Sequence, residues 1–242
     1  MKILNLGCGS KVSPDENVIN VDWSIYLRFK RHRLLRVAAP LVMRGRRLQR
    51  FEALPRNIMV HNLAKGIPFE ENSIDAVYHS HMLEHLDPPV ARKFLLDVKR
   101  VLKPGGIQRI VVPDLEHACK DYITHIAACA SNPGSVSEHD GYVAAIIEQS
   151  VRREASGTSK QGPVRRYFEN LFLGDARRRG ETHQWMYDRF NLANLLSELG
   201  YREPTQRDNR TSGIPDWSKY GLDTNERGEE YKPGSLYLEA VK

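Results

Sequence analysis

Two glycines and one aspartate near the start of the chain have the types and spacing of a nucleoside-binding site. The stretch ILNLGCGSKVSPDENVINVD, residues 3–22, places Gly7 and Gly9 directly after an apolar run and Asp22 at the end of the next one. Glycine lets backbone N–H groups approach a ligand closely, and a carboxylate at the tip of the neighbouring strand accepts hydrogen bonds from ribose hydroxyls. A plain tight turn is the alternative, because the third glycine of a dinucleotide fingerprint is missing.

A second set of chemically capable residues lies in HSHMLEHL, residues 79–86. His79 and His81 have the spacing of two residues on one face of a strand, and Glu84 and His85 follow them. Imidazoles and carboxylates act as general acids and bases and also bind metal ions. Packing and hydrogen bonding are the commoner uses of such histidines, so the sequence leads us to predict no metal site.

Two more candidates come later in the chain. Asp114 follows the fifth apolar run, where its carboxylate can orient a base or an acceptor, or simply cap the next helix. His183 opens the segment HQWMYD, residues 183–188. We predict His183 as the general base and His85 as the second candidate. For each, the alternative is a structural histidine that donates to a backbone carbonyl.

These residues need a sheet to bring them together. Short runs rich in Ile and Val, separated by turn or helix signals, read as strands buried on both faces: residues 2–6, 18–21, 58–63, 75–81 and 107–112. In doubly wound sheets, functional groups lie at the carboxyl ends of the parallel strands. Most of the candidates above follow directly on such an end.

Helical periodicity supplies the connections. One helix is predicted by an apolar stripe at helical spacing, formed by Val90, Phe94, Val98, Val101 and Leu102. A second stripe covers residues 192–199, and SLYLEAVK at 235–242 predicts a last strand. Only residues 10–17 separate the first two strands, which is shorter than a usual helical crossover and predicts a very short or absent first helix.

Composition fits one globular domain with insertions. The chain has 242 residues, of which 40% are hydrophobic and 27% charged. Its longest apolar run, VAAPLVM at 37–43, is far shorter than the roughly 20 residues of a membrane-spanning helix. The three cysteines form no CxxC pair, which argues against a disulfide framework. We therefore predict a cytoplasmic protein without a signal peptide.

Positive charge is concentrated in two segments. Residues 28–56 carry ten Lys or Arg and one acid, and residues 151–180 carry eight and three, whereas the whole chain has a net charge of +6. We predict a basic lid at about 23–56 and a helical insertion at about 115–182, both within a single domain, 1–242. Such a surface suits an acidic acceptor or an anionic membrane, and a solvated face is the alternative.

Several motifs together resemble one family. They are LNLGCG at 4–9, NVD at 20–22, HNLAKGIPFEENSIDAVYHSHMLEHL at 61–86, RVLKPGG at 100–106 and VVPDL at 111–115. This pattern is similar to class I S-adenosylmethionine-dependent methyltransferases, especially the type-11-like group often associated with bacterial surface-polysaccharide gene clusters. The resemblance implies a doubly wound, mostly parallel seven-stranded sheet, Rossmann-like, with an antiparallel C-terminal strand and helical insertions over the site.

The resemblance also implies a cofactor, S-adenosyl-L-methionine, and a set of contacts to it. Asp22 holds the ribose hydroxyls, and Asn62 meets the adenine amine although Asp is usual there. The implied cofactor-binding residues are Asn5, Gly7, Cys8, Gly9, Asp22, Trp23, Asn62, Leu63, His81 and Met82.

The predicted function is methyl transfer to a small molecule or to a glycan or lipid-linked sugar, by in-line displacement with a histidine base. Peripheral contact with an anionic inner membrane is an added option. An RNA methyltransferase and a cofactor-binding protein without catalysis are the alternatives. DPPV at 87–90 resembles the adenine-amine motif of nucleic-acid enzymes but lacks its aromatic residue. The acceptor, the methylated atom and the oligomeric state stay open.

Overall fold

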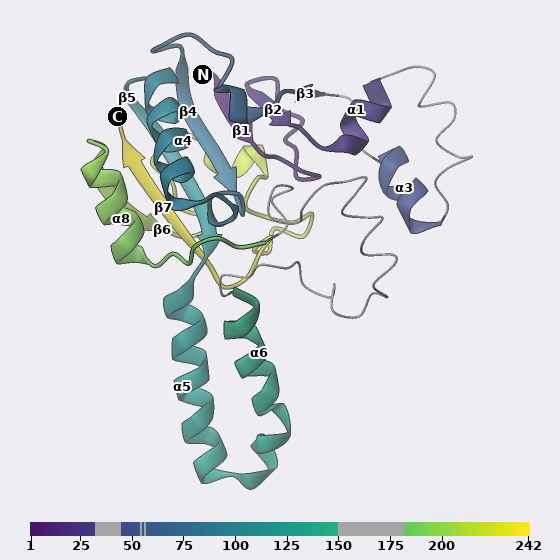
Figure 1. Ribbon diagram of the computed structural model, residues 1–242, viewed down its shortest axis with the longest axis vertical. Helices are drawn as coiled ribbons and strands as arrows, with labels where there is room; N and C mark the ends of the chain where they lie inside the picture. Colours follow the sequence, from purple (N-terminus) through teal and green to yellow (C-terminus); the bar gives the residue numbers. More distant parts are fainter. Residues whose placement is uncertain (32–44, 54, 56, 150–181) are drawn as a thin grey trace.

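A seven-stranded sheet forms the centre of the molecule, with strand order β3-β2-β1-β4-β5-β7-β6 (Figure 1). The computed structural model describes residues 1–31, 45–53, 55, 57–149 and 182–242. The strands are β1 Ile3–Leu6, β2 Val18–Asp22, β3 Ile58–Val60, β4 Ile74–Ser80, β5 Leu102–Pro113, β6 Arg202–Arg207 and β7 Ser235–Val241. The first five strands in this order, β3, β2, β1, β4 and β5, are parallel to one another, and β7 is antiparallel to both of its neighbours. The predicted doubly wound, mostly parallel seven-stranded sheet with an antiparallel C-terminal strand is confirmed.

The helices lie mainly on one face of this sheet and beyond its edge. They are α1 Ile25–Arg31, α3 Arg46–Ala53, α4 Pro88–Val101, α5 Leu115–Ser131, α6 His139–Gln149 and α8 Arg189–Glu198. Helix α4 begins with two prolines. The first turn of a helix tolerates proline because the N–H groups there have no intrahelical partner. Asp188 caps α8 by accepting from the backbone N–H groups of Phe190 and Asn191.

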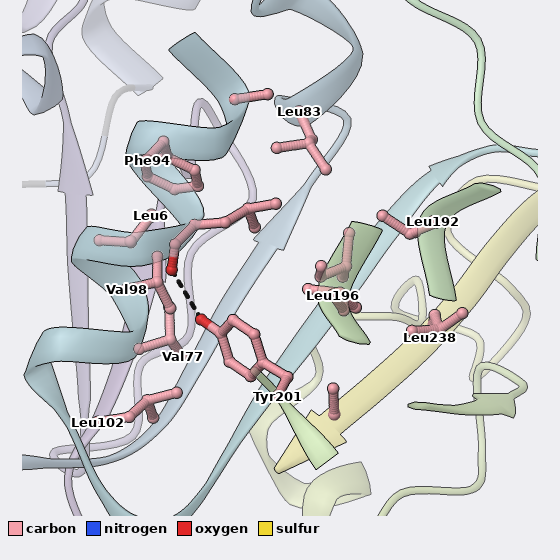
Figure 2. Close-up of a cluster of buried hydrophobic side chains, with 14 of the residues drawn as sticks. Leu6, Val77, Leu83, Phe94, Val98, Leu102, Leu192, Leu196, Tyr201 and Leu238 are labelled. Carbon is pink, nitrogen blue, oxygen red and sulfur yellow. Dashed lines mark hydrogen bonds between the residues drawn. The ribbon is translucent and has the colours of Figure 1, made fainter. Parts of the chain in front are cut away.

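The main core lies between the sheet and the helices α4 and α8 (Figure 2). Phe94 and Val98 of α4 and Leu192 and Leu196 of α8 are buried there against the strands. The hydroxyl of Tyr201 donates to the carbonyl of Leu95 at 2.8 Å, so the one polar atom of this side chain is satisfied inside the apolar layer. This core positions the end of β4, where the histidine-rich segment begins.

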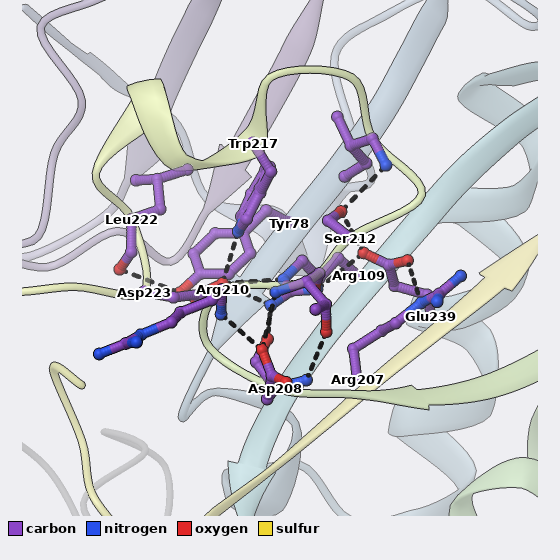
Figure 3. Close-up of polar contacts among 12 residues, drawn as sticks. Tyr78, Arg109, Arg207, Asp208, Arg210, Ser212, Trp217, Leu222, Asp223 and Glu239 are labelled. Atoms are coloured by element: carbon purple, nitrogen blue, oxygen red, sulfur yellow. Dashed lines mark hydrogen bonds and ion pairs between the residues drawn. The ribbon is translucent and has the colours of Figure 1, made fainter. Parts of the chain in front are cut away.

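The opposite face is covered by the chain between β6 and β7, which contains the short 3-10 helix η5, Trp217–Tyr220. Trp217 packs against Tyr78 of β4 with ring centroids 5.2 Å apart. Under this segment Arg109 of β5 is fully buried between two carboxylates, Asp223 and Glu239 (Figure 3). A buried ion cluster therefore fastens this covering segment to the sheet.

Several predicted elements differ in extent from the observed ones. The third strand ends at Val60, and the 3-10 helix η1, Leu63–Lys65, follows it. The fifth strand begins at Leu102, five residues before the predicted start at residue 107, because the segment Lys103–Gly106 is also extended. Strand β6 was not located in the sequence because REPTQR has no apolar alternation. Residues 7–17 contain no helix, as the short crossover predicted.

The helices α5 and α6 form a hairpin that projects from the body, joined by the 3-10 helix η3, Pro133–Glu138 (Figure 1). They occupy the first half of the predicted insertion at 115–182, and its residues 150–181 lie outside the described part. Of the predicted basic lid, residues 32–44, 54 and 56 likewise lie outside it. None of the described helices is both long enough and apolar enough to cross a membrane.

Candidate active site

The glycine turn follows the carboxyl end of β1 and is hydrogen-bonded to the carboxyl end of β2. The N–H of Gly9 donates to Oδ2 of Asp22 at 2.9 Å, and the N–H of Ser24 donates to Oδ1 at 2.7 Å. The Asp22 carboxylate therefore organises both loops, while each of its oxygens keeps a second lone pair for a ligand. Gly7 and Gly9 have φ angles of 64° and 53°, in the left-handed region that glycine tolerates best.

A cavity of about 210 Å³ lies beside this turn. Residues 7–11 form one side of it, and the other lining residues come from β1, from the end of β4 and from the loop before β7: Asn5, Tyr78, Ser80, His81, Tyr231 and Lys232. The cavity thus lies at the carboxyl edge of the parallel strands, where ligands bind in doubly wound sheets. Tyr231 and Lys232 were missed because nothing in GEEYKPG marks a site.

The two glycines of the turn meet different surroundings. A Cβ at Gly7 would lie 2.7 Å from Sδ of Met82, whereas a Cβ at Gly9 would meet no atom within 4 Å. Met82 therefore covers Gly7, and open space lies over Gly9. This open space is what a ligand that packs against the backbone requires.

We expect Gly7→Ala to destabilise the protein more than Gly9→Ala. Both variants carry the backbone cost of a left-handed residue, about 1–2 kcal/mol, and only the first also displaces Met82, which adds about 1 kcal/mol or more. Urea unfolding of the ligand-free protein measures the difference. Equal losses in the two variants would contradict the packing of Met82 on the turn.

Other predicted cofactor residues have local structural partners. Asn5 is buried and its Nδ2 donates to the carbonyl of Lys11 and to Oδ1 of Asn20, so it supports the turn from below. Burial raises the pKa of the Cys8 thiol to about 12, which keeps it protonated. Asn62 caps η1 by accepting from the N–H of Ala64 at 3.0 Å. Leu63 is half-buried in the same turn.

Several predicted residues are not among those that line the cavity: Asp22, Trp23, Asn62, Leu63, Met82, His85, Asp114 and His183. Trp23 is exposed, and the guanidinium of Arg28 lies 4.7 Å from its ring centroid. Asp114 accepts from the N–H of Glu116 at 3.0 Å, which is the helix-capping role that the sequence left open. Burial raises the pKa of the Asp114 carboxyl.

Four polar side chains gather where β4 ends and the segment before α8 returns. Glu84 and His85 belong to the 3-10 helix η2, Leu83–His85. Oε1 of Glu84 lies 3.4 Å from Nδ1 of His81 and 3.8 Å from Nε2 of His85. The rings of His85 and His183 meet edge to face with centroids 4.8 Å apart. The structure thus brings both predicted bases together around Glu84, which the sequence placed among the candidates without giving it a role.

Backbone hydrogen bonds hold this group in place. The carbonyl of Glu84 accepts from the N–H of Gln184 at 2.7 Å and of Trp185 at 3.3 Å. These bonds fasten the chain beside His183 to η2. The sequence HQWMYD drew attention to His183 but gave no sign of this docking.

Comparison with known proteins bears on this arrangement. A family model described as "Methyltransferase domain" matches residues 25–110. The matched segment contains β3, β4, η2 and α4, and it follows the glycine turn in the chain. The match covers 86 of the 242 residues, and the strand order with the antiparallel β7 agrees with the fold predicted from the sequence.

Curated relatives match parts of the chain. An uncharacterized methyltransferase of Schizosaccharomyces pombe is 32% identical over 126 residues, which are 49% of this chain and 42% of that protein. An uncharacterized methyltransferase of Synechocystis is 38% identical over 58 residues, 24% of this chain and 27% of that protein. The chain spans less than half the length of the curated relatives it matches.

Solved structures also resemble the domain. A SAM-dependent methyltransferase from Methanosarcina mazei is 18% identical, with a TM-score of 0.44, and the match covers 100% of this chain and 92% of that one. One from Archaeoglobus fulgidus is 13% identical, with a TM-score of 0.43, covering 100% and 86%.

The residues of the turn fit the cofactor of such a domain. Gly9 offers open space for close backbone approach, and Asp22 keeps lone pairs on both oxygens. The cavity continues from there to His81, at the end of β4. The turn and the cavity therefore offer room and hydrogen-bond acceptors for the predicted cofactor, S-adenosylmethionine.

Electrostatics of the histidine group follow from burial. Desolvation lowers the pKa of His81 to about 3 and that of His85 to about 4, and it raises the pKa of the Glu84 carboxyl to about 8. Both imidazoles are therefore neutral at pH 7 and can accept a proton, and the metal-free Glu84 carboxyl is mostly protonated there.

We expect the stability of the metal-free protein to fall with rising pH because of Glu84. Its carboxyl holds a proton in the folded state up to about pH 8, but loses it near 4.5 when unfolded, so stability is lost as pH rises through this window. Glu84→Gln mimics the protonated form. Between pH 6 and 8 the natural protein should lose about 1–2 kcal/mol relative to this variant.

Chemical unfolding of both proteins at three pH values measures this difference. His81 and His85, whose lowered pKa values make stability rise with pH, do not affect this difference because both proteins contain them. Parallel curves for the two proteins across this range would show that Glu84 keeps an ordinary pKa.

Proposed function

We propose that this protein transfers a methyl group from S-adenosylmethionine to a hydroxyl group of a small molecule or a sugar. The observation that carries the proposal is the glycine turn with Asp22, which borders a cavity at the carboxyl edge of the sheet. When bound, the cofactor supplies a methyl group already activated on a sulfonium. The chain must then bind, orient, exclude water and remove a proton.

Named residues divide these tasks. Asp22 accepts from the ribose hydroxyls with the lone pairs that Gly9 and Ser24 leave free. Asn62 accepts from the adenine amine with the remaining capacity of its side-chain oxygen. His81 and Met82 border the methionine end, because His81 lines the cavity and Met82 covers Gly7.

Proton removal falls to the group around Glu84. His183 is the first candidate for the base and His85 the second, since their rings are in contact and His85 is neutral at pH 7. A base works best when its pKa lies near the working pH. The low pKa of His85 makes it a weak base at neutral pH.

The acceptor is proposed to carry acidic groups. Lys11 and Lys232 line the cavity, and the basic excess of the chain lies in two segments of the sequence. Phosphorylated or lipid-linked sugars, including surface-polysaccharide intermediates, present such groups, and an anionic membrane would attract the same basic segments.

Two measurements test the proposal. Calorimetry with S-adenosylmethionine should show binding of one equivalent, and turnover with labelled cofactor should label extracted glycan intermediates but not total RNA. Label in RNA alone would favour the nucleic-acid alternative, and binding without any turnover would favour a protein that only senses the cofactor. Flotation with anionic liposomes tests the membrane contact separately.

A further inference from the structure

The carboxylate of Glu84 is buried without a hydrogen-bond partner. Its side chain is 2% exposed, and neither Oε1 nor Oε2 has a hydrogen bond. Among the described residues, Gln108 also has an unbonded side-chain oxygen, but that oxygen belongs to a neutral amide. Because an isolated buried charge is costly, this carboxyl group must hold either a proton, as in the metal-free protein, or a nearby cation.

The imidazole of His85 faces this carboxylate with a lone pair. Nδ1 of His85 lies 3.3 Å from the carbonyl of Thr182, and only a protonated nitrogen bonds a carbonyl. The other nitrogen, Nε2, is then unprotonated, and it lies 3.8 Å from Oε1 of Glu84. Two acceptors directed at each other repel unless a proton or a cation lies between them.

This arrangement matches that of metal-bound histidines. A ligating imidazole usually donates its second N–H to a carbonyl, which fixes the ring and directs the free nitrogen at the ion. Bonds of about 2.0–2.2 Å to nitrogen and oxygen place two ligand atoms of one ion about 3.0–3.5 Å apart. The observed distance of 3.8 Å between Nε2 of His85 and Oε1 of Glu84 exceeds that spacing by only a few tenths of an ångström.

His183 supplies a third ligand from the other side. The ligand atoms of Glu84, His85 and His183 all lie within 4.8 Å of one another. The backbone bonds from Gln184 and Trp185 to Glu84 fix the two segments together. Two residues of one 3-10 turn and one residue from a docked loop thus converge on one point.

We propose that Glu84, His85 and His183 bind one divalent transition-metal ion of the zinc type. Two imidazoles and one carboxylate are the ligands that such ions share, whereas Mg²⁺ and Ca²⁺ prefer oxygen alone. This replaces the prediction from the sequence that the chain holds no metal. The site depends on the cluster alone and not on methyl transfer.

Lys232 is the competing partner. Its ammonium interacts favourably with the Glu84 carboxylate, and it lines the adjoining cavity. A cation bound at Glu84 would be repelled by this charge. Lys232→Met should therefore tighten metal binding. If the lysine were instead the only counter-ion of Glu84, this variant would leave the carboxylate without a compensating charge.

Three protein ligands leave coordination positions open. If the proposed methyl transfer is also correct, the acceptor hydroxyl can bind there and lose its proton more easily, because a bound divalent ion lowers the pKa of a coordinated oxygen. His183 would then act as a ligand instead of the base. This refinement rests on the proposed function, and the metal site itself does not.

Cobalt binding tests the site on the full chain. Co²⁺ reports its ligands by visible absorption, and calorimetry gives the affinity and stoichiometry. The described residues include a second group with ligand atoms within 4.8 Å, His125, Cys129 and His139, on the α5–α6 hairpin. Cys129→Ser is the matched control, because only that group would show a thiolate-to-cobalt absorption band.

We expect one equivalent of Co²⁺ to bind without a thiolate band. Glu84→Gln and His183→Ala should each weaken binding at least 10-fold, Lys232→Met should strengthen it, and Cys129→Ser should leave it unchanged. Thermal unfolding of each variant shows that it is folded. Binding that survives Glu84→Gln and His183→Ala, or that only Cys129→Ser abolishes, would overturn the proposal, as would no binding by the natural protein at millimolar Co²⁺.

Calorimetry with S-adenosylmethionine on the same samples separates the two proposals. Cobalt binding without cofactor binding removes the proposed methyl transfer and keeps the metal site. Cofactor binding without cobalt binding does the reverse.

Discussion

Arg109→Met is expected to lower the free energy of unfolding by about 3–5 kcal/mol. The guanidinium is fully buried and donates from Nε to Asp223 at 2.8 Å and from Nη1 to Glu239 at 2.7 Å. It also donates to the carbonyls of Asp208 and Thr211 (Figure 3). Methionine fills much of the same space but leaves two buried carboxylates without their main counter-charge.

Urea unfolding of the purified variant measures the loss. Arg92→Met is the matched control, because Arg92 makes a 2.8 Å ion pair with Glu198 while both side chains are nearly half exposed. Such a surface pair contributes about 0–1 kcal/mol. Similar losses in the two variants would mean that other donors, such as Trp217 and Arg207, hold the buried carboxylates sufficiently.

Asp22→Ala is expected to weaken binding of S-adenosylmethionine by about 10- to 100-fold. Hydrogen bonds to a charged group contribute about 1.5–3 kcal/mol, and the proposed contacts to the ribose hydroxyls disappear with the carboxylate. The substitution also removes the acceptor for the N–H groups of Gly9 and Ser24, so the turn loses its brace. Isothermal titration calorimetry measures the affinity directly.

Asp15→Ala is the control for this effect. Asp15 lies in the loop between β1 and β2 and accepts hydrogen bonds from Asn17. The substitution therefore removes a nearby acid without changing the glycine turn. Cofactor affinity should stay within about twofold of the natural value. A weak effect at Asp22, or an equal effect at both positions, would show that the ribose is held elsewhere.

The regular parts of the fold could be predicted because their signals are local. Buried parallel strands read as short runs of Ile and Val, and α4 showed both an apolar stripe and its two prolines. The strand β6 could not, because REPTQR at a sheet edge carries polar residues on both faces. Its place is set by pairing with β7, which sequence periodicity does not report.

The candidate site divides in the same way. Gly9 and Asp22 were found because a turn between adjacent strands is a short-range feature. Glu84 was recognised only as one residue of a histidine-rich run, since its importance comes from burial by a segment 100 residues later. Arg109 read as an ordinary strand residue, because its two carboxylate partners lie more than 110 positions away.

The buried ion cluster of Arg109, Asp223 and Glu239 also affects how mutational screens should be interpreted. Tyr78 lines the cavity and donates to Asp223 at 2.7 Å, and Tyr231 and Lys232 lie only a few positions beyond that aspartate. A substitution at Arg109 will therefore reshape the ligand-facing wall from behind. Loss of turnover in such a variant would report a displaced wall, and a screen that scores activity alone would assign a chemical role to a residue that never meets the substrate.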